Sequence, residues 1–270
     1  MTPPIRLIAC DLDGTLVGPD LRLAPGAVAA FRRAAARGVH VAVATGRMLT
    51  SATPYARELG VEAPVITYNG AWIRCLKTNS DLWHHAVPTE TVAEAVSALE
   101  DAGLHVNLYL DDRVHVRVRS AEAEAYLAHA RVEPVWCDAW ADLGPVSPTK
   151  ILAIGPEPRI REVLDALRPR FAGRLWLTQS MPTFLEVANP MVNKGAALAH
   201  LAAHLGVPQE SVVAVGDGLN DLEMLQWAGL GVAMGNGHPE LQRQADRVTG
   251  RVEDDGVARL IDELIAEGRC

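Results

Sequence analysis

Two aspartates stand one residue apart near the start of the chain, after a short and mostly apolar run. Asp11 and Asp13 follow residues 5–10, and Gly14 comes next. Residues two apart share one face of an extended strand, and a glycine lets the backbone turn there. A carboxylate at a strand tip is a candidate nucleophile, and a second one beside it is a candidate general acid or base.

Two carboxylates this close resist joint ionisation unless a proton or a cation lies between them. Asp217 and Asp221 supply further carboxylates, which makes an acidic set with Asp11 and Asp13 that contains neither histidine nor cysteine. Oxygen ligands suit Mg²⁺, whereas zinc sites usually contain nitrogen or sulfur ligands. The set therefore predicts a Mg²⁺ site.

An anionic substrate would also need hydrogen-bond donors. The Thr45 hydroxyl, the Gly46 N–H and the Lys194 ammonium group are chemically suited to phosphate oxygens. They lie in the short sequences TGR and NKG, each of which is expected at a strand end or a helix start. We therefore predict that these three groups donate hydrogen bonds to a bound phosphate group.

Each motif also has a purely structural interpretation. Asp-Gly is a common turn, TGR and NKG are typical of caps, and GDGLND at 216–221 is compatible with a loop that caps a helix. All four occur in one chain, in an order that would place them along one edge of one sheet. This combination favours a functional site over four unrelated turns.

The elements that must position these residues alternate between short β-rich runs and helical stretches. This alternation occurs in the first third of the chain and again from residue 193. It predicts an α/β fold, a doubly wound, Rossmann-like parallel sheet, whose ligands bind at the carboxyl ends of the strands.

The middle of the chain has a different rhythm, with alternating runs around a tight Asp111–Asp112 turn that indicate antiparallel pairing. We expect a core domain formed by 1–83 and 187–270, with an inserted α+β domain at 84–186. Helices are expected in the insertion at 89–102, 120–130 and 157–168.

Composition limits the classes of function. The chain has 270 residues, a formal net charge of −8 and no run of Lys or Arg, which argues against a nucleic-acid partner. Its four cysteines form no CxxC pair, so neither a disulfide framework nor a zinc site is indicated. No signal segment or membrane-length apolar run is evident, so we expect a cytoplasmic protein without a membrane partner, as a monomer or small homo-oligomer.

The sequences DLDGT, TGR, NKG and GDGLND together resemble the pattern of the haloacid dehalogenase-like (HAD) superfamily of phosphohydrolases. Segments 68–71, 216–225 and 232–258 look like its Cof-type phosphatase subfamily, in which a large α+β cap lies between the second and third motifs. In 84–186 the resemblance rests on length and on the pattern of strands and helices alone.

The resemblance implies a role for each matching residue. Asp11 would attack phosphorus and become a phospho-aspartate, and Asp13 would protonate the leaving oxygen and later activate water. Mg²⁺ would bind the Asp11 carboxylate, the Asp13 carbonyl and the Asp217 carboxylate, with Asp221 in support. Thr45 and Lys194 would hold the phosphoryl oxygens, and four weaker candidates lie near the phosphate or substrate: Gly46, Arg47, Asn69 and Asn220.

The leading hypothesis is therefore a Mg²⁺-dependent phosphatase acting on small phosphorylated metabolites, either sugar phosphates or flavin and nucleotide phosphates. A phosphomutase could use the same phospho-aspartate to move a phosphoryl group between sugar positions. A non-catalytic protein that binds phosphorylated metabolites is the third hypothesis, and the complete set of motif residues argues against it.

Overall fold

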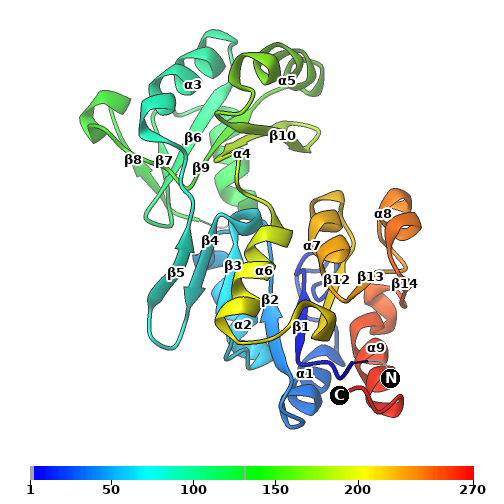
Figure 1. Cartoon of the computed structure of the whole chain (residues 1–270). Helices are drawn as coiled ribbons and strands as arrows, with labels where there is room; N and C mark the ends of the chain where they lie inside the picture. Colours follow the sequence, from blue (N-terminus) through cyan, green and yellow to red (C-terminus); the bar gives the residue numbers. More distant parts are fainter. Residues whose placement is uncertain (1–2, 131) are drawn as a thin grey trace. The chain divides into compact units, whose positions relative to one another are not determined.

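The structure is a computed structural model that describes residues 3–130 and 132–270. The chain divides into two compact units (Figure 1): unit 1 comprises Met1–Trp83 and Asn193–Cys270, and unit 2 comprises His84–Val192. The sequence predicts an insertion that ends at 186, whereas unit 2 continues to Val192. The reason is that strand β11 (Phe184–Ala188) pairs with β9 (Lys150–Ile154) and thus belongs to the sheet of unit 2.

Unit 1 is built on a five-stranded parallel sheet with the order β14-β13-β12-β1-β2. Its strands are β1 (Leu7–Cys10), β2 (His40–Val43), β12 (Val212–Gly216), β13 (Leu230–Ala233) and β14 (Arg247–Val248). All of β1 is buried, as expected for the centre of a sheet that is covered on both faces. The predicted doubly wound α/β fold is confirmed.

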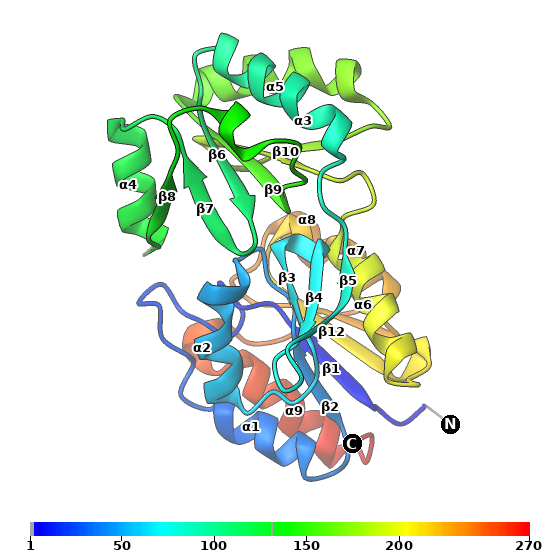
Figure 2. The same cartoon turned by 90° about the vertical axis from the view of Figure 1, so that its left-hand side faces the viewer.

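Helices cover both faces of this sheet, and the residues of β1 alternate between them. Ile8 and Cys10 pack in the same core as helices α1 (Ala27–Ala35), α2 (Leu49–Leu59) and α9 (Gly256–Ala266). Leu7 and Ala9 face the opposite core, which includes α6 (Lys194–His204), α7 (Leu222–Trp227) and α8 (Pro239–Gln244). In Figure 2, α1 and α9 lie side by side although they come from opposite ends of the chain.

The central position of β1 makes this end of the sheet a switch point. From β1 the chain reaches β2 on one side, and it later returns as β12 on the other. The loops that follow these three strands therefore meet at the same edge, where ligands bind in folds of this kind.

A small antiparallel sheet of β3 (Val65–Thr67), β4 (Trp72–Cys75) and β5 (Ser80–His84) completes unit 1. A parallel bridge between Ala44 and Ile66 connects it to the end of β2. The short 3₁₀ helices of unit 1 are Tyr68–Gly70, Gln209–Ser211, Leu219–Asp221 and Val252–Asp254.

Unit 2 has its own six-stranded sheet, with the order β10-β11-β9-β6-β7-β8. Besides β9 and β11, its strands are β6 (His105–Leu110), β7 (Arg113–Val116), β8 (Pro134–Trp136) and β10 (Trp176–Met181). Helices α3 (Thr89–Asp101) and α5 (Glu157–Phe171) share an apolar core with one face of this sheet, and α4 (Ala121–Ala130) and the 3₁₀ helix Trp140–Leu143 complete the unit. The tight turn predicted between β6 and β7 is present, and Asp111 and Asp112 both have positive φ there.

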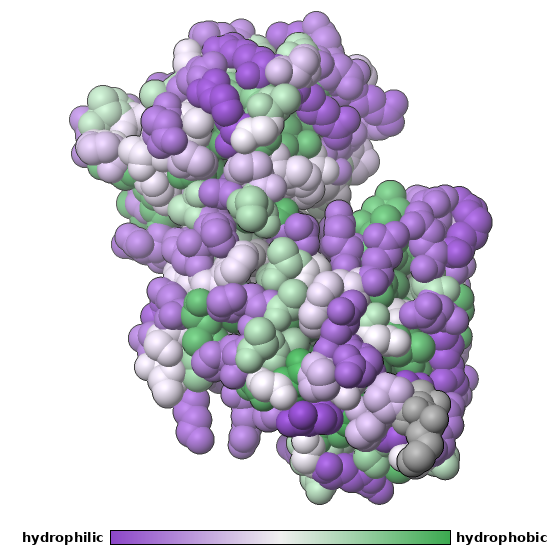
Figure 3. Space-filling model, in the orientation of Figure 1, coloured by the Kyte–Doolittle hydropathy of each residue, from purple (hydrophilic) through white to green (hydrophobic). Residues whose placement is uncertain are grey.

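Within the part of the chain that the structure describes, no helix has the length and apolar character needed to cross a bilayer. On the face drawn in Figure 3, apolar residues form small groups separated by hydrophilic ones.

Candidate active site

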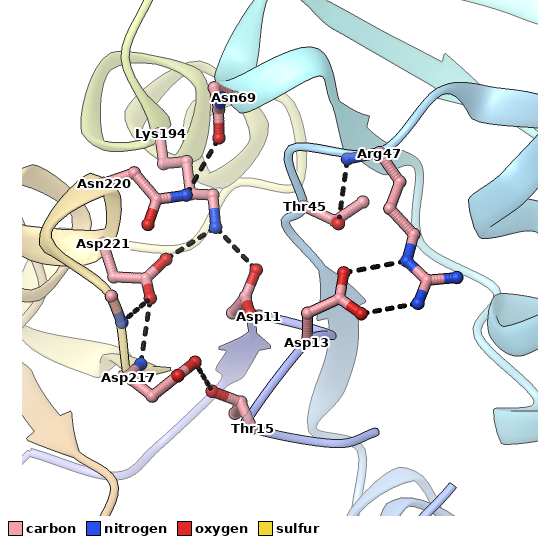
Figure 4. Close-up of polar contacts among 11 residues, drawn as sticks. Asp11, Asp13, Thr15, Thr45, Arg47, Asn69, Lys194, Asp217, Asn220 and Asp221 are labelled. Carbon is pink, nitrogen blue, oxygen red and sulfur yellow. Dashed lines mark hydrogen bonds and ion pairs between the residues drawn. The ribbon is translucent and has the colours of Figure 1, made fainter. Parts of the chain in front are cut away.

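Three loops at the switch point of the unit 1 sheet carry most of the predicted site residues (Figure 4). Asp11 follows β1, Thr45 follows β2 after one residue, and Asp217 follows β12. Because β1 pairs with both β2 and β12, these three loops start side by side.

Lys194 joins two of these loops through its ammonium group. Its Nζ lies 2.6 Å from Asp11 Oδ1 and 2.6 Å from Asp221 Oδ1. The lysine is fully buried, and both carboxylate partners are almost fully buried as well. Lys194 begins α6, and the Asn193 side chain caps this helix by accepting a hydrogen bond from the Ala196 N–H at 2.7 Å. The cap fixes the point at which the lysine enters the site.

Burial and neighbouring charges shift the pKa of these groups. Burial alone would lower the pKa of Lys194, but the carboxylates of Asp11 and Asp221 raise it above its ordinary value, so the ammonium stays protonated. Burial raises the pKa of Asp11; Lys194 opposes this shift, and Asp221 and Asp217 add to it. A cation bound at this place would relieve the repulsion among the carboxylates.

The loop after β12 is organised by Asp221. Its Oδ2 accepts hydrogen bonds from the backbone N–H groups of Asp217 and Gly218, both at 2.9 Å. Gly216 is needed beside it, because a Cβ at that position would lie 2.4 Å from Asp221 Cγ. Asp221 thus fixes the loop on one side and Lys194 on the other.

Asp217 is held from the first loop, since the Thr15 hydroxyl donates to its Oδ1 at 3.0 Å. Burial and the Asp221 carboxylate raise the pKa of Asp217 to about 6, although Thr15 and Lys194 oppose the shift. Gly14 has a φ of 81°, and a Cβ there would lie 2.2 Å from Asp217 Oδ2. Only a glycine fits at this turn.

The three carboxylates of Asp11, Asp217 and Asp221 form a group that could hold a metal ion. Each offers one oxygen, and the three oxygens lie within 4.8 Å of one another. An all-oxygen donor set of this kind fits a hard cation such as Mg²⁺. The carboxylate of Asp13 points elsewhere, so from the predicted metal set only its backbone carbonyl remains as a candidate ligand.

Asp13 forms a two-pronged ion pair with Arg47. Arg47 Nε lies 2.8 Å from Asp13 Oδ2, and Nη2 lies 2.5 Å from Oδ1. The hydrogen bond to Asp13 is the main cause that raises the pKa of Arg47, whose guanidinium also lies 4.8 Å from the centre of the Tyr55 ring. The sequence places Arg47 near the phosphate, and the structure shows it bound to the proposed acid–base residue.

The remaining predicted residues lie around Thr45. Thr45 is fully buried, and its hydroxyl accepts a hydrogen bond from the Arg47 N–H at 3.1 Å. Asn69 Oδ1 accepts from Asn220 Nδ2 at 3.0 Å, and a Cβ on Gly46 would lie 2.9 Å from that Asn69 oxygen. The structure therefore brings all the predicted site residues to one edge of one sheet.

Two further residues contact the site although the sequence pattern gives them no role. Thr15 belongs to the DLDGT motif, but the motif does not indicate its partner, because the hydrogen bond to Asp217 spans 202 residues. Asn236 donates to the Gly14 carbonyl at 2.7 Å from a segment 222 residues away. In the sequence, Asn236 lies within segment 232–258, whose resemblance to the Cof-type subfamily assigns this residue no role.

Fold and site together define a class of α/β proteins in which carboxylates and a lysine gather at the switch point of a parallel sheet. Within that class the chain belongs to the haloacid dehalogenase-like hydrolases, whose family model matches residues 8–261. The predicted family is confirmed, and so is the prediction of a phosphoric monoester hydrolase.

Relatives match over nearly the whole chain. The 5-amino-6-(5-phospho-D-ribitylamino)uracil phosphatase YitU of Bacillus subtilis is 31% identical over 268 residues, which cover 96% of this chain and 97% of YitU. The HMP-PP phosphatase of Serratia proteamaculans is 31% identical over 270 residues, with coverages of 96% and 95%. A crystal structure of a haloacid dehalogenase-like hydrolase from Bacteroides thetaiotaomicron superimposes with a TM-score of 0.89 at 26% identity and covers 96% of this chain and 99% of its own.

Proposed function

We propose that this chain is a Mg²⁺-dependent phosphatase that hydrolyses small phosphorylated metabolites through a phospho-aspartate on Asp11. The observation that carries the proposal is the position of Asp11, buried at the tip of β1 and 2.6 Å from the Lys194 ammonium within an acidic cluster. A carboxylate held by a strand end and a buried ammonium group has a fixed position from which it can act as a nucleophile.

In the first half of the reaction, an Asp11 carboxylate oxygen attacks phosphorus and the bond from phosphorus to the ester oxygen breaks. Asp13 donates a proton to the leaving oxygen, which departs as an alcohol. In the second half, water attacks the phosphorus of the phospho-aspartate and Asp13 accepts a proton from that water. Inorganic phosphate leaves, and Asp11 is regenerated as a carboxylate.

Asp13 suits the proton-transfer role because its side chain is about half exposed, with 51% of its surface accessible, and does not take part in the Lys194 network. Arg47 holds its carboxylate to one side through two hydrogen bonds. A phosphate dianion also attracts a guanidinium group, so substrate would compete with Asp13 for Arg47. Asp13 released from Arg47 would take up a proton from solvent, which its half-exposed side chain can reach, and would then donate that proton to the leaving oxygen.

Mg²⁺ fits the oxygen donors of Asp11 and Asp217, with the Asp13 carbonyl as a further ligand. Both oxygens of Asp221 already accept hydrogen bonds, which suits a supporting role beside the ion. When bound, the ion would neutralise charge that develops on the phosphoryl oxygens. Lys194 and Thr45 lie at the same edge and are proposed to hold those oxygens.

The substrate class is proposed from the relatives. The name of YitU specifies a phosphorylated ribityl compound, and that of the Serratia enzyme specifies HMP-PP. Sugar phosphates and flavin or nucleotide phosphates therefore remain the proposed substrates. We also propose that unit 2 selects the leaving group, as a cap would, because every residue assigned to the chemistry belongs to unit 1.

The proposal is tested by phosphate release from nitrophenyl phosphate and a panel of metabolite phosphates, with Mg²⁺ and with EDTA. We expect release that needs Mg²⁺ and falls by roughly 10³-fold or more in Asp11→Asn, as expected for loss of a nucleophile. Asp262→Asn serves as the control, because Asp262 is an exposed aspartate paired with Arg33. Absence of release from every ester, or full activity of Asp11→Asn, would refute the proposal.

A further inference from the structure

A short segment after β13 contacts both catalytic loops through hydrogen bonds. Met234 N–H donates to the Gly216 carbonyl at 2.9 Å, and His238 N–H donates to the Asp217 carbonyl at 2.8 Å. Between them, Asn236 Nδ2 donates to the Gly14 carbonyl at 2.7 Å. Residues 234–238 thus connect the turn after Asp13 with the loop that carries Asp217.

The Asn236 amide is fixed from both sides. Its Oδ1 accepts a hydrogen bond from the Val252 N–H at 2.8 Å, while its Nδ2 serves Gly14. The neighbouring Gly235 N–H donates to the Gly250 carbonyl at 3.0 Å, which anchors the same segment to residues 250–252. The amide oxygen can only accept a hydrogen bond and the amide nitrogen can only donate one, so these two contacts determine the orientation of the amide.

The Gly14 peptide needs an external anchor of this kind. Glycine has the widest range of backbone conformations of any residue type. Gly14 adopts a φ of 81° directly after Asp13. No side chain fits at this position, because a Cβ would lie 2.2 Å from Asp217 Oδ2. The Gly14 N–H is bound to the Val17 carbonyl at 2.9 Å, and Asn236 binds the carbonyl at the other end of the residue.

We propose that Asn236 is a positioning residue for the reaction: it holds the Gly14 peptide so that Asp13 reaches the leaving oxygen. This inference rests on the proposed function, in which Asp13 is the general acid. Misplacement of a catalytic group by about 1 Å can cost roughly 10²-fold in rate. Loss of the Asn236 hydrogen bond therefore acts on proton donation more than on the attack by Asp11.

The dependence of rate on the leaving group separates these two effects. Nitrophenolate leaves readily without a proton, whereas an alkoxide leaving group depends strongly on the general acid. The ratio of kcat/KM for an alkyl phosphate to kcat/KM for nitrophenyl phosphate therefore reports on Asp13. A lower fraction of folded enzyme reduces both values equally and leaves the ratio unchanged.

The test compares Asn236→Asp and Asn236→Ala with wild type and with the control Thr249→Val. Asn236→Asp keeps an acceptor for the Val252 N–H but cannot donate to Gly14. Thr249→Val removes a hydrogen bond to the Gly256 carbonyl; Thr249 follows β14 and makes no hydrogen bond to Gly14. We expect the ratio to fall about tenfold in both Asn236 variants, part of the 10²–10⁴-fold range of general-acid catalysis, and to stay unchanged in Thr249→Val.

An unchanged ratio in both Asn236 variants would overturn the inference, whatever the loss of total activity. Failure of both variants to fold would also overturn it, since Asn236 would then serve stability and not the turn. Wild-type protein that releases no phosphate from any ester would instead refute the proposed function, so the two failures are distinguishable.

Discussion

At the scale of single residues, the site depends on a lysine placed between two buried carboxylates. Lys194 is the only positive charge in contact with Asp11 and Asp221 among the hydrogen bonds and ion pairs found in residues 3–130 and 132–270. Burial of unpaired charge is costly, so the three side chains depend on one another.

Lys194→Met should therefore affect both stability and activity. Removal of one member of a buried ion pair typically costs about 3–5 kcal/mol, and here it leaves two carboxylates facing each other. We expect urea unfolding of the metal-free variant to show a free energy of unfolding that is lower by this amount. We also expect loss of phosphatase activity. The exposed Lys77→Met is the control. Wild-type stability in Lys194→Met would contradict the proposed network.

The raised pKa of Asp217 should make Mg²⁺ binding depend on pH. Its pKa is raised to about 6, so the metal-free protein carries a proton there below that pH and a negative charge above it. Mg²⁺ must displace this proton, and its affinity should therefore fall as the pH decreases from 7.5 to 5. Titration calorimetry measures the dissociation constant at each pH. Equal values across this range would exclude Asp217 as a ligand that titrates near pH 6.

At the scale of elements, the turn after β1 packs so closely against the loop after β12 that Gly14 has no room for a Cβ. Gly14 is the contact point, since a Cβ there would lie 2.2 Å from Asp217 Oδ2. The arrangement of the three carboxylates of Asp11, Asp217 and Asp221 is therefore set by how the two loops pack and not by the aspartates alone.

Gly14→Ala should weaken Mg²⁺ binding by displacing Asp217. Gly38→Ala is a closely matched control, because Gly38 has a φ of 80° and no atom within 4 Å of an added Cβ. Both substitutions incur the backbone strain of a left-handed residue, about 1–2 kcal/mol, but only the first disturbs the cluster. We expect calorimetry to show loss of Mg²⁺ affinity in Gly14→Ala alone. The same affinity in both variants would contradict the packing argument.

The sequence predicts those parts of the site and its supporting elements that depend on local residue patterns. The apolar run before Asp11 and the helix that starts at Lys194 are local features, and a parallel sheet brings their ends together. Pairing of Asp13 with Arg47 and of Gly14 with Asn236 depends on how loops meet after folding, which residue spacing does not encode. The predicted end of the insertion, residue 186, falls inside β11, and the pairing of β11 with β9 and β10, which carries unit 2 past that residue, forms only in the folded sheet.

At the scale of the whole molecule, both ends of the chain build the unit that contains the site. The Ile5 N–H donates to the Arg269 carbonyl at 2.6 Å, and the Arg6 N–H donates to the Ser211 carbonyl at 2.8 Å. Unit 2 is continuous in sequence and has a separate apolar core between its sheet and helices α3 and α5. Its stability should therefore not require unit 1.

A fragment of residues 84–192 should fold by itself. We expect a cooperative thermal transition by circular dichroism, because the core that closes this sheet lies within the fragment. The fragment should release no phosphate, since the proposed site residues are all in unit 1. A fragment without a cooperative transition would show that the two units depend on each other for stability.

The central claim is that a phosphoryl group is transferred to Asp11. Enzyme mixed with substrate and Mg²⁺ is quenched during turnover and treated with borohydride, which reduces an aspartyl phosphate to homoserine. Trypsin then releases the peptide of residues 7–22, which contains Asp11, Asp13 and Asp20. Fragment masses should locate homoserine at position 11 only, and only in samples that received substrate. Homoserine at position 13 or 20, or its absence during demonstrated turnover, would contradict the account.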